Sequence, residues 1–217
     1  MREEAEKLSS LPAGTRVPFL YDGQMEAVIR DLAIQAAGGV SVPGRALTPW
    51  PDRSQIGPTP PSLPHRERGD VAGAVVDGVE MSVVELVRMG EKVQAEIQGS
   101  GKREIVVLGG PLEEAAERAM LAWATVTGAA VVLDPNPASR VATAAWVRPT
   151  VFHGSPAEIA GLRVWAEKEK KKRLPFRRLR TILVTGAEWM AREDEEFWRG
   201  RGARVASLPH SGVNRGI

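Results

Sequence analysis

Residues 148–156 read Arg148-Pro-Thr-Val-Phe-His-Gly-Ser-Pro156, and this stretch decides how the chain folds. The apolar run that precedes His153 predicts a short buried strand. Pro156 suits the first position of a helix, where its missing N–H costs no hydrogen bond. The segment therefore predicts a strand that passes through a short turn into a helix, the unit from which parallel sheets are built.

The same alternation continues on both sides of this segment. Strands are expected at residues 15–20, 40–43, 74–76, 104–108, 129–133, 149–152, 179–185 and 203–206. Helices are expected at residues 24–37, 81–98, 112–126, from 134 or 136 to 146, from 156 to the basic run that begins at 168, and at 187–198. Right-handed crossovers leave few topologies for such a pattern, which predicts an α/β fold with a mainly parallel sheet flanked by helices.

The length of the chain bounds its domain organisation. A sequence of 217 residues can bury a full core, and we expect a single α/β domain over residues 1–217. Residues 1–43 are expected to form a first strand–helix–strand unit, residues 44–70 a proline-rich linker, and residues 71–217 the main body. Prolines crowd the linker and can neither continue a helix nor donate to a sheet, so it is expected to be extended.

The composition excludes several classes of site. The chain has no cysteine, and its three histidines are far apart, so thiolate chemistry is excluded and no metal site is expected. A formal net charge of +2 does not predict nucleic-acid binding. No stretch approaches the ~18 apolar residues of a membrane span, and the charged N-terminus lacks a signal-peptide core. We therefore expect a cytoplasmic protein without a membrane partner.

Four segments follow one another along the chain: Val107-Leu-Gly-Gly-Pro111-Leu112, Thr127-Gly-Ala-Ala-Val-Val132, Arg148-Pro-Thr-Val-Phe-His-Gly-Ser-Pro156 and Leu179-Arg-Thr-Ile-Leu-Val-Thr-Gly186. In this order they resemble consecutive landmarks of the adenylate-forming superfamily, most closely its long-chain acyl-CoA synthetase branch. Glu117-Arg118 also matches a helix of that branch, whereas Glu114 stands where a histidine is usual. The resemblance implies part of the N-terminal domain of an acyl-CoA synthetase.

The resemblance also implies where a ligand would lie. In the family, the turn after the Arg148–Phe152 strand lines the acyl or adenylate pocket, and a glycine that ends a later strand borders the adenine. The resulting pocket candidates are His153, Gly154, Ser155, Pro156, Gly186, Ala187 and Glu188. Ser155 also fits an ordinary helix N-cap, so a capped helix start explains the first four residues equally well.

The sequence departs from the family where ATP would be held. Residues 54–65 replace the Ser/Thr/Gly-rich phosphate loop with a stretch rich in proline, which lacks the N–H donors that a phosphate nest needs. Residues 207–212 replace the magnesium-binding signature and contain no acid. We therefore expect no catalytic residue and no cofactor, with ATP, magnesium or CoA bound only if activity were retained.

Three functions follow from this combination. We expect a catalytically inactive relative that binds a small acyl, aryl or CoA-type ligand or acts as a regulatory subunit. A minimal acid-CoA ligase or adenylating enzyme that needs a partner subunit is the first alternative, and a purely structural interaction protein is the second. A homodimer is expected, because part of a larger domain would otherwise expose a sheet edge or a tryptophan-rich helical face.

Two further features favour ordinary structural roles. Basic residues between Lys168 and Arg180 form the only concentrated positive segment, which is typical of a solvated helix end, with binding of a CoA phosphate or RNA as the secondary interpretation. The tryptophans are expected to anchor a core or an interface. Those on expected helices are Trp123, Trp146, Trp165, Trp189 and Trp198.

Overall fold

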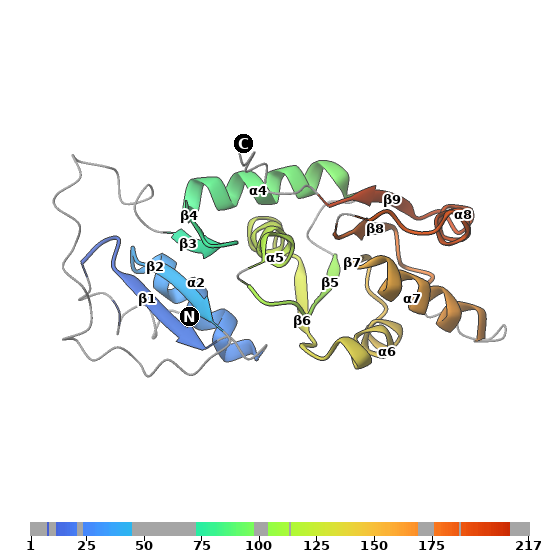
Figure 1. The fold of residues 1–217 in the computed structure, drawn as a ribbon, viewed down its shortest axis with the longest axis horizontal. Coiled ribbons are helices and arrows are strands. Elements are labelled where there is room, and N and C mark those ends of the chain that lie inside the picture. The colour runs from blue at the N-terminus through green and yellow to red at the C-terminus, as the bar shows by residue number, and fades with distance from the viewer. Residues whose placement is uncertain are drawn as a thin grey trace. The chain divides into compact units, whose positions relative to one another are not determined.

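The computed structural model describes residue 8 and residues 12–20, 24–44, 73–97, 104–112, 114–168, 176–186 and 188–208. Two compact units emerge (Figure 1): unit 1 comprises Met1–Arg88 and Gly110–Arg118, and unit 2 comprises Met89–Gly109 and Ala119–Ile217. The boundary passes through helices α4 (Val83–Glu96) and α5 (Ala115–Thr127). The single domain with a linker stays a prediction, because residues 45–72 lie outside the described part of the chain.

Unit 1 contains a four-stranded sheet in the order β1-β2-β3-β4. Its strands are β1 (Arg16–Leu20), β2 (Val40–Gly44), β3 (Gly73–Val76) and β4 (Val79–Ser82), and helix α2 (Met25–Ala36) connects the first two. The first three strands are parallel, whereas β4 pairs antiparallel with β3. Residues 16–44 thus form a strand–helix–strand unit.

The helix expected from residue 81 begins two residues later, and that prediction was wrong at its start. Asp77 and Gly78 both have positive φ, 49° and 77°, which is the geometry of a tight hairpin turn. The turn folds Met81 and Ser82 back onto β3 as part of β4. Ser82 then caps α4, because its Oγ accepts from Glu85 N–H at 3.3 Å, and Ser82 N–H donates in return to Glu85 Oε2 at 2.7 Å.

Unit 2 contains a five-stranded sheet in the order β6-β5-β7-β8-β9, and all its pairs are parallel. The strands are β5 (Ile105–Leu108), β6 (Ala130–Leu133), β7 (Val151–Gly154), β8 (Thr181–Val184) and β9 (Arg204–Ser207). The helices that connect them after α5 are α6 (Pro137–Val147), α7 (Pro156–Lys168) and α8 (Arg192–Gly200). The α/β class with a parallel sheet and flanking helices is confirmed.

The strand order of unit 2 creates a switch point between β5 and β7. From β5 the chain moves outward to β6, then crosses back and continues from β7 to β9. Right-handed crossovers place α5 on one face of the sheet and α6, α7 and α8 on the other. Ligands of open parallel sheets bind at the carboxyl ends of strands beside such a reversal.

The core of unit 2 lies between β7, β8 and the helices that cover them. Every residue of these two strands is buried, as expected for central parallel strands. Trp198 is 1% exposed and packs edge-on against Phe176, with ring centroids 5.7 Å apart. Among the described helices, none is long and apolar enough to cross a membrane.

The five tryptophans that the structure describes divide into two groups. Trp123 and Trp198 are buried, as core anchors should be, whereas Trp146, Trp165 and Trp189 are 85%, 38% and 47% exposed. Trp189 lies outside any helix, because α8 begins at Arg192 rather than near residue 187. Three acidic residues in the first turn of α8 favour this later start through the helix dipole.

Candidate functional site

The carboxyl ends of the unit 2 strands form one edge, which we call the carboxyl edge. Strands β5, β6, β7 and β8 end there and are followed by Gly109, Asp134, Ser155 and Thr185. Backbone hydrogen bonds extend the pairing beyond the strands: Asp134 N–H donates to Leu108 O at 2.8 Å and Thr185 N–H to Gly154 O at 2.9 Å. The predicted pocket residues His153–Pro156 and Gly186 therefore lie along this edge.

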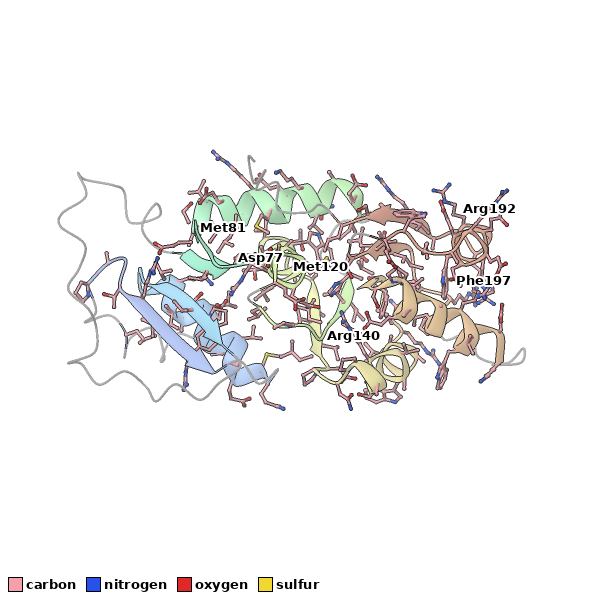
Figure 2. All side chains as sticks on the ribbon, viewed as in Figure 1. Asp77, Met81, Met120, Arg140, Arg192 and Phe197 are labelled. Carbon is pink, nitrogen blue, oxygen red and sulfur yellow. The ribbon has the colours of Figure 1, made fainter. Side chains whose placement is uncertain are left out.

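Arg140 occupies the switch point between β5 and β7. Its side chain extends from α6 towards the strands (Figure 2) and is 8% exposed. Nη2 lies 3.0 Å from His153 Nε2 and donates to the carbonyl oxygens of His153 at 3.2 Å and Val107 at 3.5 Å. Nη1 donates to Glu158 Oε1 at 3.2 Å, so one guanidinium joins β5, β7 and α7.

His153 is neutral in this arrangement. Since arginine can only donate, the ring nitrogen that faces it must accept, which leaves the proton on Nδ1. Burial lowers the pKa of His153 well below 6.5, and the positive charge of Arg140 lowers it further against the opposing effect of Glu158. At 1% exposure, His153 does not contact a solvent-borne substrate in this structure.

Ser155 and Glu158 form a reciprocal capping box at the start of α7. Ser155 N–H donates to Glu158 Oε2 at 2.8 Å, and Glu158 N–H donates to Ser155 Oγ at 3.4 Å. Pro156 occupies the first helical position. The capped helix start is confirmed, and Glu158 serves both the cap and Arg140.

Asp134 organises the start of α6. Its carboxylate accepts hydrogen bonds from Asn136 N at 3.1 Å, Ser139 Oγ at 2.9 Å and Thr143 Oγ1 at 2.5 Å. Burial raises the pKa of Asp134, but these hydrogen bonds and the charge of Arg140 outweigh it and leave the pKa below 3.8. Asn136 is the N-cap, because its side chain accepts from Ala138 N–H.

Close packing restricts two glycines at this edge. A Cβ on Gly109 would lie 2.2 Å from the carbonyl oxygen of Asp134, and one on Gly154 would lie 2.9 Å from Phe152 Cε1. Gly186 differs, because a Cβ there would meet nothing within 4 Å although its φ is +98°. The carboxyl edge is thus filled at the switch point and open at Gly186.

The remaining pocket candidates have different surroundings. Glu188 is exposed beyond β8, and Ala187 lies outside the described residues. Residues 54–65, 98–103 and 209–217 also lie outside them, and the missing phosphate loop stays a sequence prediction. Among the described residues, no group of three or more histidines and carboxylates is placed to hold a metal ion.

The Glu117-Arg118 pair lies in unit 1 and serves packing there. Arg118 is 2% exposed, its Nη1 lies 2.5 Å from Asp31 Oδ2, and its Nε donates to Leu112 O at 3.1 Å. Gln35 also donates to Asp31 at 2.9 Å. This buried ion pair joins α2 to α5. The sequence around Asp31 did not indicate this role.

Sequence reasoning missed Arg140, which binds His153, Val107 and Glu158 at the carboxyl edge. Its place among the small residues of α6 predicts only an exposed cation. The available signal was positional: α6 follows a strand beside the switch point, and a residue one turn into such a helix can reach back over the strand ends.

Comparisons with known proteins identify the fold. No family model matches the sequence, and no curated protein matches it. The structure is similar to the nonribosomal peptide synthetase FmoA3 in its AMPPNP-bound form, with a TM-score of 0.70 and 18% identity over 93% of this chain. It is similar to the N-terminal domain of FACL13 from Mycobacterium tuberculosis, with a TM-score of 0.67 and 14% identity over 94% of the chain.

The anthranilate CoA ligase AuaEII in complex with anthranoyl-AMP is a further neighbour, with a TM-score of 0.68 and 13% identity over 93% of the chain. The chain spans 27% of the FmoA3 structure, 65% of the FACL13 domain and 51% of AuaEII. At these identities the likeness concerns the fold. This chain therefore has the fold of part of the N-terminal domain of adenylate-forming enzymes.

Proposed function

We propose that this protein is a non-catalytic binding or regulatory protein that accepts an acyl, aryl or CoA-type ligand at the carboxyl edge of unit 2. One observation carries the proposal: the ionisable side chains at the switch point bind one another, while backbone around Gly186 stays open. Parallel sheets bind ligands outside their carboxyl ends, so the open part of this edge is the natural place for one.

The charged groups at the switch point are already bound to one another, which argues against ATP as the ligand there. A triphosphate requires uncommitted cations and backbone donors, and Arg140 is bound to His153, Glu158 and Val107. Buried neutral His153 is a poor acid or base for a bound carboxylate, since it is shielded from solvent and faces a fixed cation. These observations support a role without adenylate chemistry.

A thermal-shift experiment tests the proposal. The full chain would be heated with fatty acids, aryl acids, CoA, AMP or ATP, and we expect stabilisation by an acyl, aryl or CoA compound. A ligand at 100 times its dissociation constant adds about 2.7 kcal/mol. Pyrophosphate exchange by the isolated chain would overturn the non-catalytic assignment, and a protein that responds to none of the acyl, aryl or CoA compounds would overturn ligand binding.

A matched pair of glycine variants locates the ligand. Gly186→Leu and Gly202→Leu both force a side chain into positive φ, +98° and +84°, with no atom within 4 Å of the new Cβ. Gly186 follows β8 at the carboxyl edge, whereas Gly202 precedes β9 at the other end of the sheet. We expect the ligand response to disappear in Gly186→Leu alone. Equal responses in both variants would contradict the location.

A structural interaction protein is the second candidate, favoured by the packed switch point around Arg140. It predicts no response to small molecules. In either case we propose self-association as a homodimer, since β6 is an edge strand of apolar residues that are only partly buried. Light scattering across a range of concentrations measures the mass in solution.

A further inference from the structure

The ends of α6 and α7 carry exposed tryptophans at equivalent places. Trp146 is the tenth residue of α6, counted from Pro137, and Trp165 is the tenth residue of α7, counted from Pro156. Their side chains are 85% and 38% exposed. Exposure of two neighbouring indoles leaves apolar surface in water, so these positions need an explanation beyond the core.

The two helices pack against each other. Each leaves a strand of one parallel sheet and returns to the start of the next, so both end at the edge where the strands begin. Nine residues of helix correspond to about 14 Å along the axis, which places both indoles at a similar height. Both indoles therefore lie near the edge of the sheet where the strands begin.

Cations gather at the same edge. Arg148 follows α6, Lys168 ends α7, and Arg177 and Arg178 precede β8; all four are exposed. Arg180 N–H donates to Thr150 O at 2.8 Å, which brings the segment before β8 beside the segment before β7. None of the four makes an ion pair with a residue that the structure describes.

We propose that these six residues form a docking surface for an anionic lipid bilayer. We call it the amino-edge surface: Trp146, Arg148, Trp165, Lys168, Arg177 and Arg178. Tryptophan partitions into the headgroup region with its ring in the apolar boundary, and arginine and lysine attract acidic lipids. Peripheral docking needs no spanning helix.

The arrangement favours a bilayer over a protein or RNA partner. The indole of Trp146 is 85% exposed, and the two indoles occupy equivalent positions on neighbouring helices. A bilayer binds a surface whose apolar side chains reach the headgroup region and whose charges attract its lipids, and it needs no pocket of matching shape. The hot spots of protein interfaces, by contrast, lie in well-packed pockets. Unpaired cations on one copy would repel those of a second copy across a symmetric contact.

Vesicle flotation with the full chain tests the proposal. We expect the protein to float with vesicles of phosphatidylcholine and phosphatidylserine, and much less with phosphatidylcholine alone. The Trp146→Ser, Trp165→Ser double variant should weaken partition by roughly tenfold per tryptophan, from the apolar area withdrawn from the membrane. The Arg177→Gln, Arg178→Gln double variant should weaken it by about fivefold per arginine, and added salt should mimic that loss.

Matched controls come from the opposite edge of unit 2. Trp189→Ser removes an indole that is 47% exposed, and Arg192→Gln removes a cation that is 90% exposed. Both residues lie between β8 and the first turn of α8, and neither variant should change flotation. Circular dichroism checks that every variant is folded.

Several outcomes would overturn the proposal. Failure of the wild-type chain to float, equal flotation with phosphatidylcholine alone, or equal losses in the control variants would each do so. Two further measurements distinguish a bilayer from another anion or a second copy of the chain. Binding to poly-glutamate or single-stranded RNA without vesicle binding would assign the amino-edge surface to another anion, and loss of a dimer in the tryptophan variant without vesicle binding would assign it to a second copy.

Discussion

Arg140 supplies hydrogen bonds to three acceptors at the switch point. His153 Nε2, the carbonyl oxygen of His153 and Glu158 Oε1 all lie within 3.2 Å of its terminal nitrogens. Removal of one member of a buried charged network leaves the others unsatisfied, which costs more than the network contributes when intact. This residue therefore controls the stability of the switch point.

Replacement of Arg140 by methionine tests that view. The variant keeps much of the side-chain volume and removes every donor, and we expect the free energy of unfolding to fall by about 3 kcal/mol. Arg192→Met is the control, because Arg192 is 90% exposed and its pair with Glu196 is a surface one. Urea denaturation should show a change within about 0.5 kcal/mol for the control. Equal effects would refute the argument.

His153 makes the stability of the protein depend on pH. Its pKa is lower in the folded protein than the value of 6.5 expected when unfolded, so the unfolded chain binds the proton more readily. Its contribution is complete above pH 6.5 and is lost as pH falls below that value towards the folded-state pKa. Asp134 acts in a separate window, below its unfolded pKa of 3.8.

The His153→Gln variant isolates this effect. As pH falls below 6.5, the wild-type free energy of unfolding should fall by up to about 1.4 kcal/mol per pH unit more steeply than that of the variant. Chemical denaturation at several pH values measures both slopes. Parallel pH profiles would show that the folded protein accepts a proton on His153 as readily as the unfolded chain.

At the scale of elements, two helices begin with the same motif in different surroundings. Ser82 and Glu85 cap α4 at an exposed site, and Ser155 and Glu158 cap α7 at a partly buried one. Glu158 also accepts from Arg140 at 3.2 Å. The two helix starts therefore share the same capping box and differ in how deeply it is buried.

We expect Glu85→Ala to destabilise the protein by about 1 kcal/mol, the usual value of a helix cap. Glu158→Ala should cost about 2 kcal/mol more, because it also leaves Arg140 with one partner fewer. In the Arg140→Met background the two glutamate variants should become similar. Thermal or urea unfolding of the wild type, the three single variants and the two double variants measures the difference, and an unchanged difference in the Arg140→Met background would refute the coupling.

At the scale of the whole molecule, the unit 2 sheet separates two surfaces. Candidate ligand residues follow β7 and β8, and the cations of the amino-edge surface precede them. A strand of four residues spans about 13 Å, beyond the distance at which substitutions usually interact.

The two activities should therefore vary independently. Gly186→Leu should abolish the ligand response and leave vesicle flotation unchanged, and the Trp146→Ser, Trp165→Ser variant should do the reverse. Thermal shift and flotation of the same preparations provide the measurement. Joint loss of both properties in either variant would show that the surfaces are coupled.

The sequence by itself determined the class of fold and most of its elements. Buried strands such as 105–108 and 181–184 are continuous apolar runs, and proline at 137 and 156 marks helix starts, so local chemistry is sufficient there. It failed at residues 81–82, where a helical apolar pattern was overridden by the hairpin turn at Asp77.

Only the tertiary structure decided what the candidate residues do. His153 has the same neighbours in sequence whether its ring faces a ligand or a guanidinium, and it is the strand order that brings Arg140 onto it. Trp146 and Trp123 look alike along the chain, yet one is 85% exposed and the other buried. Periodicity encodes local structure, whereas partners distant in sequence meet only when the sheet sets which strands are neighbours.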